Sequence, residues 1–172
     1  MIRWADVSQD ALSAPDVTAF ARRELEAIAD PVVREALSQR LVDPELHLRD
    51  WEYGAPGERY PCWTVAKDLP SDCALVYSLH GHGPGNPWGL VALSNAWFGM
   101  DSGWFLRLED AFVESSMGGA LCIWDVISPD GTALLSSVCI DEAFAYRDAV
   151  DAPLTRPIHH VLYRSRLPGG VP

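Results

Sequence analysis

The spacing of apolar residues predicts two short helices early in the chain. Between residues 15 and 29, apolar side chains recur every three or four positions with charged residues on the other side, which is typical of an amphipathic helix. The same period returns from 31 to 41. Pro31 suits the first turn of this second helix, and Asp30 can cap it. We expect Asp43-Pro44 to end it.

Later runs predict strands, because they alternate between apolar and polar positions or are rich in aromatic and β-branched residues. The expected strands span 60–66, 74–79, 89–94, 120–127, 132–140 and 160–166. The stretch from 45 to 60 lacks such a pattern, so we expect an irregular loop with a turn near Gly54 and Gly57.

A central helix is predicted over 104–115, where apolar residues fall on one face. Asp101 or Ser102 can cap its start, and Gly118-Gly119 can end it.

With a last helix over 141–150, the order of elements indicates an α+β fold rather than a regular βαβ alternation. We expect a single domain over 1–172, with an N-terminal arm (1–14) and a flexible tail (167–172). It would contain a mainly antiparallel sheet of about six strands, with the N-terminal helix pair and the central helix packed on it.

The charge of the chain narrows the classes of partner. Asp and Glu number 24 against 13 Lys and Arg, a formal net charge of −11. Nucleic acid attracts basic surfaces, so this balance disfavours it and favours a basic protein partner. The chain starts without a basic and apolar leader and has no apolar run of about 18 residues, so we expect no membrane segment and a cytoplasmic location.

The four cysteines are far apart, lack CxxC spacing and sit in apolar runs, so we interpret them as small buried residues. They are Cys62, Cys73, Cys122 and Cys139.

A loop rich in glycine and proline, 80–87, joins the second and third predicted strands and carries His80 and His82. If the strand continued through both residues, the two imidazoles would lie on the same face and could provide two ligands of a metal site. The third ligand would come from one of four residues: His47, Asp101, His159 or His160. Alternatively, the glycines let the backbone turn and the imidazoles bond loop carbonyls; this interpretation is favoured, and we expect no cofactor.

Two fragments resemble parts of an α/β-hydrolase: the loop at His80–Gly83, and the serines before Gly118. The resemblance fails because Glu114 replaces the glycine that the nucleophile turn requires. Ser116 also follows a predicted helix rather than a strand.

Acidic and aromatic residues gather in and around the predicted central helix. Its carboxylates, Glu109 and Asp110 among them, could serve as acid and base but suit a solvated face better. Seven tryptophans are many for a chain of 172 residues, and Trp often anchors binding surfaces. We expect Trp104 in the core. The expected partner-binding residues are His80, His82, Asn86, Trp88, Trp97, Asp101 and Glu109.

Three segments, Trp51-Glu52-Tyr53-Gly54, Cys62-Trp63-Thr64-Val65 and Gly83-Pro84 with Pro87-Trp88-Gly89-Leu90-Val91, resemble a group of uncharacterised bacterial proteins. This resemblance covers about 45–125. In size and acidity the chain is also similar to the immunity proteins of bacterial toxin systems. That likeness implies a protein that covers the active site of a toxin, often a basic nuclease.

The sequence therefore predicts a non-enzymatic, cytoplasmic protein-binding module, with a basic toxin as the partner that the resemblance implies. The alternative is a small metal-dependent or acid/base hydrolase that uses the His80/His82 loop.

Overall fold

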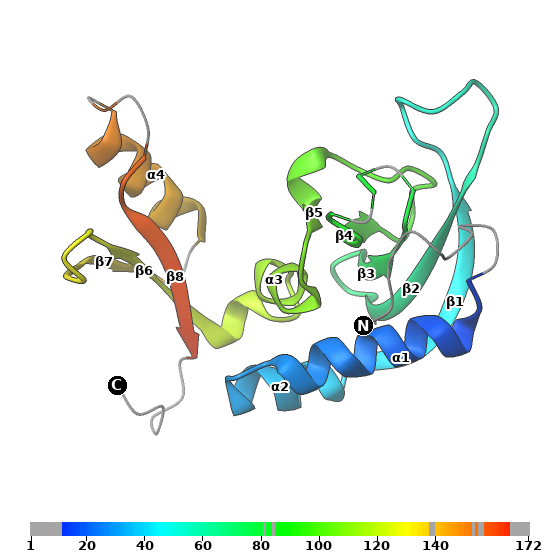
Figure 1. Cartoon of the computed structure of the whole chain (residues 1–172), viewed down its shortest axis with the longest axis horizontal. Helices are drawn as coiled ribbons and strands as arrows, with labels where there is room; N and C mark the ends of the chain where they lie inside the picture. The colour runs from blue at the N-terminus through cyan, green and yellow to red at the C-terminus, as the bar shows by residue number, and fades with distance from the viewer. Residues whose placement is uncertain are drawn as a thin grey trace. The chain divides into compact units, whose positions relative to one another are not determined.

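The computed structural model describes residues 12–80, 82–83, 85–137, 140–152, 154 and 157–165. The chain divides into two compact units, Met1–Ser116 and Met117–Pro172. Helices and two antiparallel sheets confirm the α+β class (Figure 1). The expectation of one sheet of about six strands is wrong, because one sheet has five strands and the other has three. A single domain stays a prediction.

Both predicted N-terminal helices are confirmed, as α1 (Ala14–Ala27) and α2 (Pro31–Ser38). The backbone amide and hydroxyl of Ser13 donate to the Asp16 carboxylate at 2.9 and 2.5 Å, which closes the first turn of α1. The Asp30 carboxylate caps α2 by accepting from the amides of Val32 and Val33, at 2.8 and 3.3 Å.

The expected loop over 45–60 begins instead as a strand, β1 (Leu41–Arg49), so Asp43-Pro44 does not end α2. This strand is the edge of the larger sheet, and most of its side chains are exposed on both faces. Leu46 and Leu48 do alternate with polar residues, but both are about half-exposed, so this short alternation does not mark a buried face. Pro44 is tolerated because the pairing of β1 with its neighbour is irregular between Leu41 and Glu45.

The larger sheet is a meander in which each strand pairs with the next one along the chain. After β1 come β2 (Tyr60–Asp68), β3 (Cys73–Tyr77), β4 (Trp88–Ala92) and β5 (Trp104–Phe105). The first three predicted strands are confirmed within a few residues.

The register gives this sheet two buried faces. Trp63, Tyr77 and Trp88 are direct partners on neighbouring strands and share the first face. Phe20 of α1 contacts it, with ring centroids of Phe20 and Tyr77 5.4 Å apart. The second face carries a core cluster: Cys62, Ala74, Val76, Val91, Phe98 and Trp104.

The predicted central helix is shorter than expected. Residues Asp101–Gly103 form a 3-10 turn (η3), Trp104 starts β5, and α3 spans only Leu108–Glu114. Trp104 joins the sheet because its indole lies against Gly89, where an added Cβ would come within 2.9 Å of the ring. Tertiary packing thus overrides the helical pattern.

The C-terminal unit has a short 3-10 turn, η4 (Gly119–Leu121), then β6 (Cys122–Ile127), β7 (Ala133–Ser137), α4 (Ile140–Asp151) and β8 (His160–Ser165). Its sheet has the order β7-β6-β8. The predicted hairpin, last helix and last strand are confirmed, although β7 ends at Ser137.

The expected burial of the cysteines is confirmed for Cys62 and Cys122, whereas Cys73 is half-buried. None of these three forms a disulfide with another described residue. Cys139 lies outside the described residues, as do most of the expected N-terminal arm and the expected tail.

Candidate functional site

The loop 93–103, which we name the Trp97 loop, is fixed by a buried arginine at the end of β1. Arg49 is only 4% exposed. Its Nη1 donates to the carbonyl oxygens of Ala92, Asn95 and Trp97, at 3.1, 2.5 and 3.2 Å. A buried guanidinium requires strong hydrogen-bond acceptors. Arg49 therefore holds these three carbonyl groups in place.

The backbone and an indole fix the same loop from two further sides. The Asp50 amide donates to the Ala96 carbonyl at 2.7 Å, and the Phe98 amide donates to the Asp50 carbonyl at 3.0 Å. Phe98 is 1% exposed, and its carbonyl accepts from Nε1 of Trp104 at 3.0 Å. The loop therefore has a fixed conformation and a buried anchor.

Between these anchors the loop directs two large apolar side chains to solvent. Trp97 is 49% exposed and Met100 is 78% exposed. An exposed Trp on a fixed loop suits partner binding, because little side-chain and loop entropy is lost when the complex forms.

His80 and His82 pack into an aromatic cluster next to the Phe98 anchor. The centroid of the His80 ring lies 5.2 Å from that of Tyr60, and the centroid of His82 lies 5.4 Å from that of Trp104. Trp51 also contacts this cluster, with its ring centroid 6.5 Å from that of His82. Ring packing thus positions the two histidines behind the Trp97 loop.

Two aspartates adjoin the loop, Asp72 near its start and Asp50 beside Trp97. Asp50, which pairs with Trp97 through the backbone, forms an ion pair with Arg59 at 3.2 Å. The Asp72 carboxylate accepts from the hydroxyl and the amide of Ser94, at 2.5 and 2.8 Å. These bonds lower the pKa of Asp72 below its ordinary value, so it is charged at neutral pH.

The structure brings together only part of the expected partner-binding set. His80 and His82 pack on Tyr60 and Trp104, the two rings that contact Phe98, and Trp97 precedes Phe98 in the loop. Asn86 is exposed in the turn before β4. Trp88 was expected on the binding surface, but the structure corrects this: its side chain is 2% exposed and packs on Tyr77, on the other face of the sheet.

Of the two remaining members of that set, Glu109 lies outside the Trp97 loop and Asp101 lies within it. Glu109 lies on α3 beside Arg107, with 3.9 Å between the carboxylate and the guanidinium. For Asp101 only the backbone, in η3, is described. Arg49 and Phe98 were not predicted as site residues, because an arginine that ends a strand and an isolated Phe carry no local signal of burial.

The alternative metal site finds no support in the described part of the chain. There, no three His, Cys, Asp or Glu side chains form a group that could hold a metal ion. His47 lies 3.6 Å from Glu45 on exposed β1. His159 bonds Asp151 in the C-terminal unit at 2.6 Å.

The serine of the hydrolase-like fragment has a structural role. The Ser116 hydroxyl, just after α3, donates to the Asp68 carboxylate at 2.8 Å. It also lies 2.6 Å from the Ser71 hydroxyl. The described residues give Ser116 no histidine partner, so this contact ties the end of α3 to the β2–β3 turn.

Glu114, at the end of α3, has a carboxylate with a shifted pKa. Partial burial, and to a smaller extent the charge of Asp110 one turn earlier, raise the pKa of Glu114 to about 7. The pKa of Asp110 is also raised, mainly by burial. The pair therefore holds protons more tightly than a solvated acidic face would.

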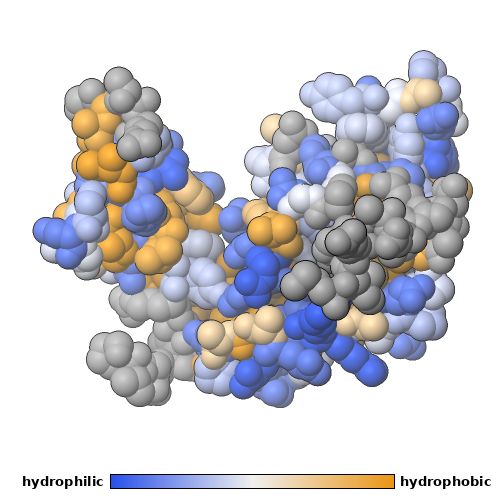
Figure 2. Space-filling model, viewed as in Figure 1, coloured by the Kyte–Doolittle hydropathy of each residue, from blue (hydrophilic) through white to orange (hydrophobic). Residues whose placement is uncertain are grey.

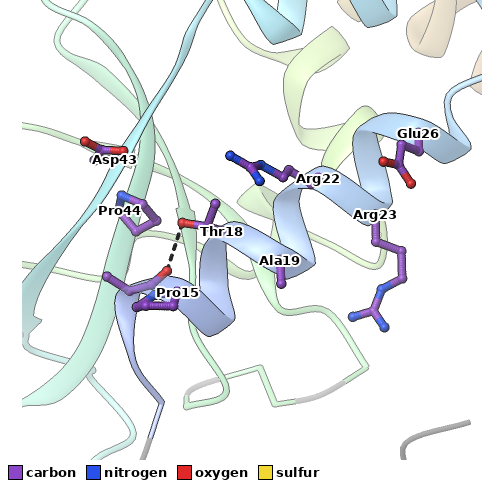
Figure 3. Close-up of a pocket in the computed structure, with 9 residues that line it drawn as sticks. Pro15, Thr18, Ala19, Arg22, Arg23, Glu26, Asp43 and Pro44 are labelled. Carbon is purple, nitrogen blue, oxygen red and sulfur yellow. Dashed lines mark hydrogen bonds between the residues drawn. The ribbon is translucent and has the colours of Figure 1, made fainter.

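A groove of about 590 Å³ runs between α1 and β1 (Figure 3). Its walls include Thr18, Arg22, Glu26 and Asp43. It contains none of the residues that the sequence predicted for a site.

Exposed apolar residues also occur on the C-terminal unit, where Figure 2 shows hydrophobic residues gathered over α4 and the strands beside it. They include Tyr146, Val150 and Leu162, which are between 36% and 56% exposed.

Comparison of the chain with known protein families, curated proteins and solved structures found no match. Within the described residues, no helix combines the length and the apolar character needed to cross a bilayer.

Proposed function

We propose that the protein is a non-enzymatic binding module that docks a basic protein partner on its Trp97 loop. The observation that carries this proposal is the half-exposed Trp97 on a loop that Arg49 and Phe98 fix from inside. Such an aromatic residue can enter a pocket of the partner without a large ordering cost.

The charge supports the choice of a basic partner. The whole chain has a formal net charge of −11, and Asp50 and Asp72 adjoin the loop. Opposite charge on the partner would accelerate the encounter, and the buried aromatic contact would then slow dissociation.

The likeness to immunity proteins in size and acidity makes a bacterial toxin the specific partner that we propose, in the cytoplasm. The hydrolase alternative is not favoured, because no described group of residues offers a metal site and Ser116 serves a structural contact.

The test is capture of partners from the lysate of the source cells by the immobilised full chain, followed by mass spectrometry. We expect one basic protein, retained at low salt and released as salt rises. The Trp97→Ala variant should lose at least about tenfold in affinity for it.

Leu46→Ala is the matched control, because Leu46 is also 49% exposed but shares the sheet face of Trp63 and Tyr77. It should bind the partner as the unmodified chain does. Equal binding by Trp97→Ala, or a captured partner without a basic surface, would contradict the proposal.

A further inference from the structure

A small pocket of about 250 Å³ opens on the N-terminal unit, away from the Trp97 loop. It lies among α1, the β3–β4 pair and the residues that join β5 to α3. Apolar walls come from Phe20, Trp88 and Leu106. A volume of this size suits a ligand with a single ring.

Tyr77 lines this pocket and is 1% exposed. Among the described residues its hydroxyl has no hydrogen-bond partner. Buried hydroxyls are nearly always paired, because an unpaired one costs stability. Burial raises the pKa of Tyr77 to about 12, so the group is a donor at neutral pH.

The charged residues of the pocket leave an excess of positive charge. The Glu24 carboxylate is already engaged, since it accepts from Nε of Arg107 at 3.1 Å and from the Leu108 amide at 3.3 Å. The guanidinium of Arg23 stacks 5.2 Å from the centroid of Phe20. No described carboxylate pairs with Arg23.

We propose that this pocket binds a small monocarboxylic acid with an aromatic body. The carboxylate would accept from the Tyr77 hydroxyl and pair with Arg23, while the ring lies against Phe20, Trp88 and Leu106. An organic cation would be repelled by the two guanidinium groups. A neutral apolar ligand would leave Arg23 and the Tyr77 hydroxyl unpaired.

The probe is phenylacetate, with phenylacetamide as its neutral analogue, titrated into the isotopically labelled full chain and followed by NMR. We expect phenylacetate to shift the amide signals of Leu106 and Arg107 and the indole signal of Trp88, with a Kd on the order of 1 mM. Phenylacetamide should bind at least about fivefold more weakly.

Two variants test the roles of the polar groups. Tyr77→Phe keeps the ring and removes the hydroxyl, and Arg23→Leu removes the cation; each should weaken phenylacetate about three- to tenfold. Arg22→Leu is the matched control, because Arg22 leaves α1 on a different side from Arg23 (Figure 3). It should change the affinity less than about twofold.

Three results would overturn the proposal. The first is equal affinity for the acid and the amide. The second is an Arg22→Leu effect as large as that of Arg23→Leu, which would indicate general charge attraction. The third is an absence of shifts in the pocket signals with phenylacetate, benzoate and hexanoate alike.

Discussion

The Nη1 atom of Arg49 lies 2.5 Å from the carbonyl oxygen of Asn95, although 46 positions separate the two residues in the chain. This contact joins the end of the edge strand β1 to the loop that follows β4. It makes the exposed Trp97 part of a rigid surface, since the same guanidinium also bonds the Trp97 carbonyl.

Replacing Arg49 with Met should destabilise the fold by about 2–4 kcal/mol, because three carbonyls lose the buried, charged donor that they share. The free energy of unfolding in urea measures this loss. Hydrogen exchange at 95–98 should also become faster. Arg59→Met is the control, since Arg59 forms an exposed ion pair with Asp50 and should cost about 1 kcal/mol or less. Equal losses in the two variants would show that Arg49 is not an anchor.

Gly89→Ala should destabilise the protein by about 1–3 kcal/mol, because the new methyl group would lie 2.9 Å from the indole of Trp104. Thermal or urea unfolding measures the effect. Gly85→Ala is the matched control, as its added Cβ would have no atom within 4 Å. If both variants unfold at the same denaturant concentration, the close packing of Trp104 on β4 is not a constraint.

The two N-terminal helices were predictable because their signals are local. Ser13 with Asp16, and Asp30 with Pro31, stand within one turn of the ends that they define. By contrast, the direction of Trp104 depends on Gly89, a residue on another strand, so a helical pattern in sequence could not reveal that Trp104 belongs to a sheet.

The candidate site was predictable only in part, for the same physical reason. Trp97 was expected on the surface and is half-exposed, whereas Trp88 was expected there and is buried. Which tryptophan faces solvent depends on register, since Trp88 pairs with Tyr77 across the sheet. Arg49 was missed because its acceptors come from a distant loop.

In the C-terminal unit, stability should fall at acidic pH through Asp151. Burial raises the pKa of this carboxyl, but bonds from the ring and amide of His159 and from the Ile158 amide outweigh burial and lower it. Because the pKa of Asp151 is lower in the folded state than in the unfolded state, ionised Asp151 stabilises the fold at pH values above the unfolded pKa of 3.8. This stabilisation is lost as the pH falls through the pKa of the folded state.

Asp151→Asn should therefore weaken the C-terminal unit at neutral pH and remove this part of its acid sensitivity. Urea unfolding from pH 7 to about pH 2, followed through the environment of Trp124, measures both effects. Asp148→Asn is the control on the same helix, because the Asp148 side chain is 62% exposed beside Arg147. An unchanged pH profile for Asp151→Asn would refute the assignment.

The thiol of Cys62 should resist alkylation in the native protein. Burial raises its pKa to about 12, although the nearby Arg49 lowers it slightly. Cys73 also has a raised pKa but is only half-buried, so it should react first. Peptide mapping after iodoacetamide treatment, with and without urea, measures the order. Equal native labelling of both thiols would contradict the burial of Cys62.

The meander order of the larger sheet bears on how the protein is made. Every strand from β2 to β5 pairs with the strand that precedes it in the chain. Each new strand therefore meets a partner that the ribosome has already released, and the closure of each hairpin costs little loop entropy. The Arg49 contact with the Trp97 loop spans a longer stretch of chain, so this loop would be fixed in place only after the hairpins that support it have formed.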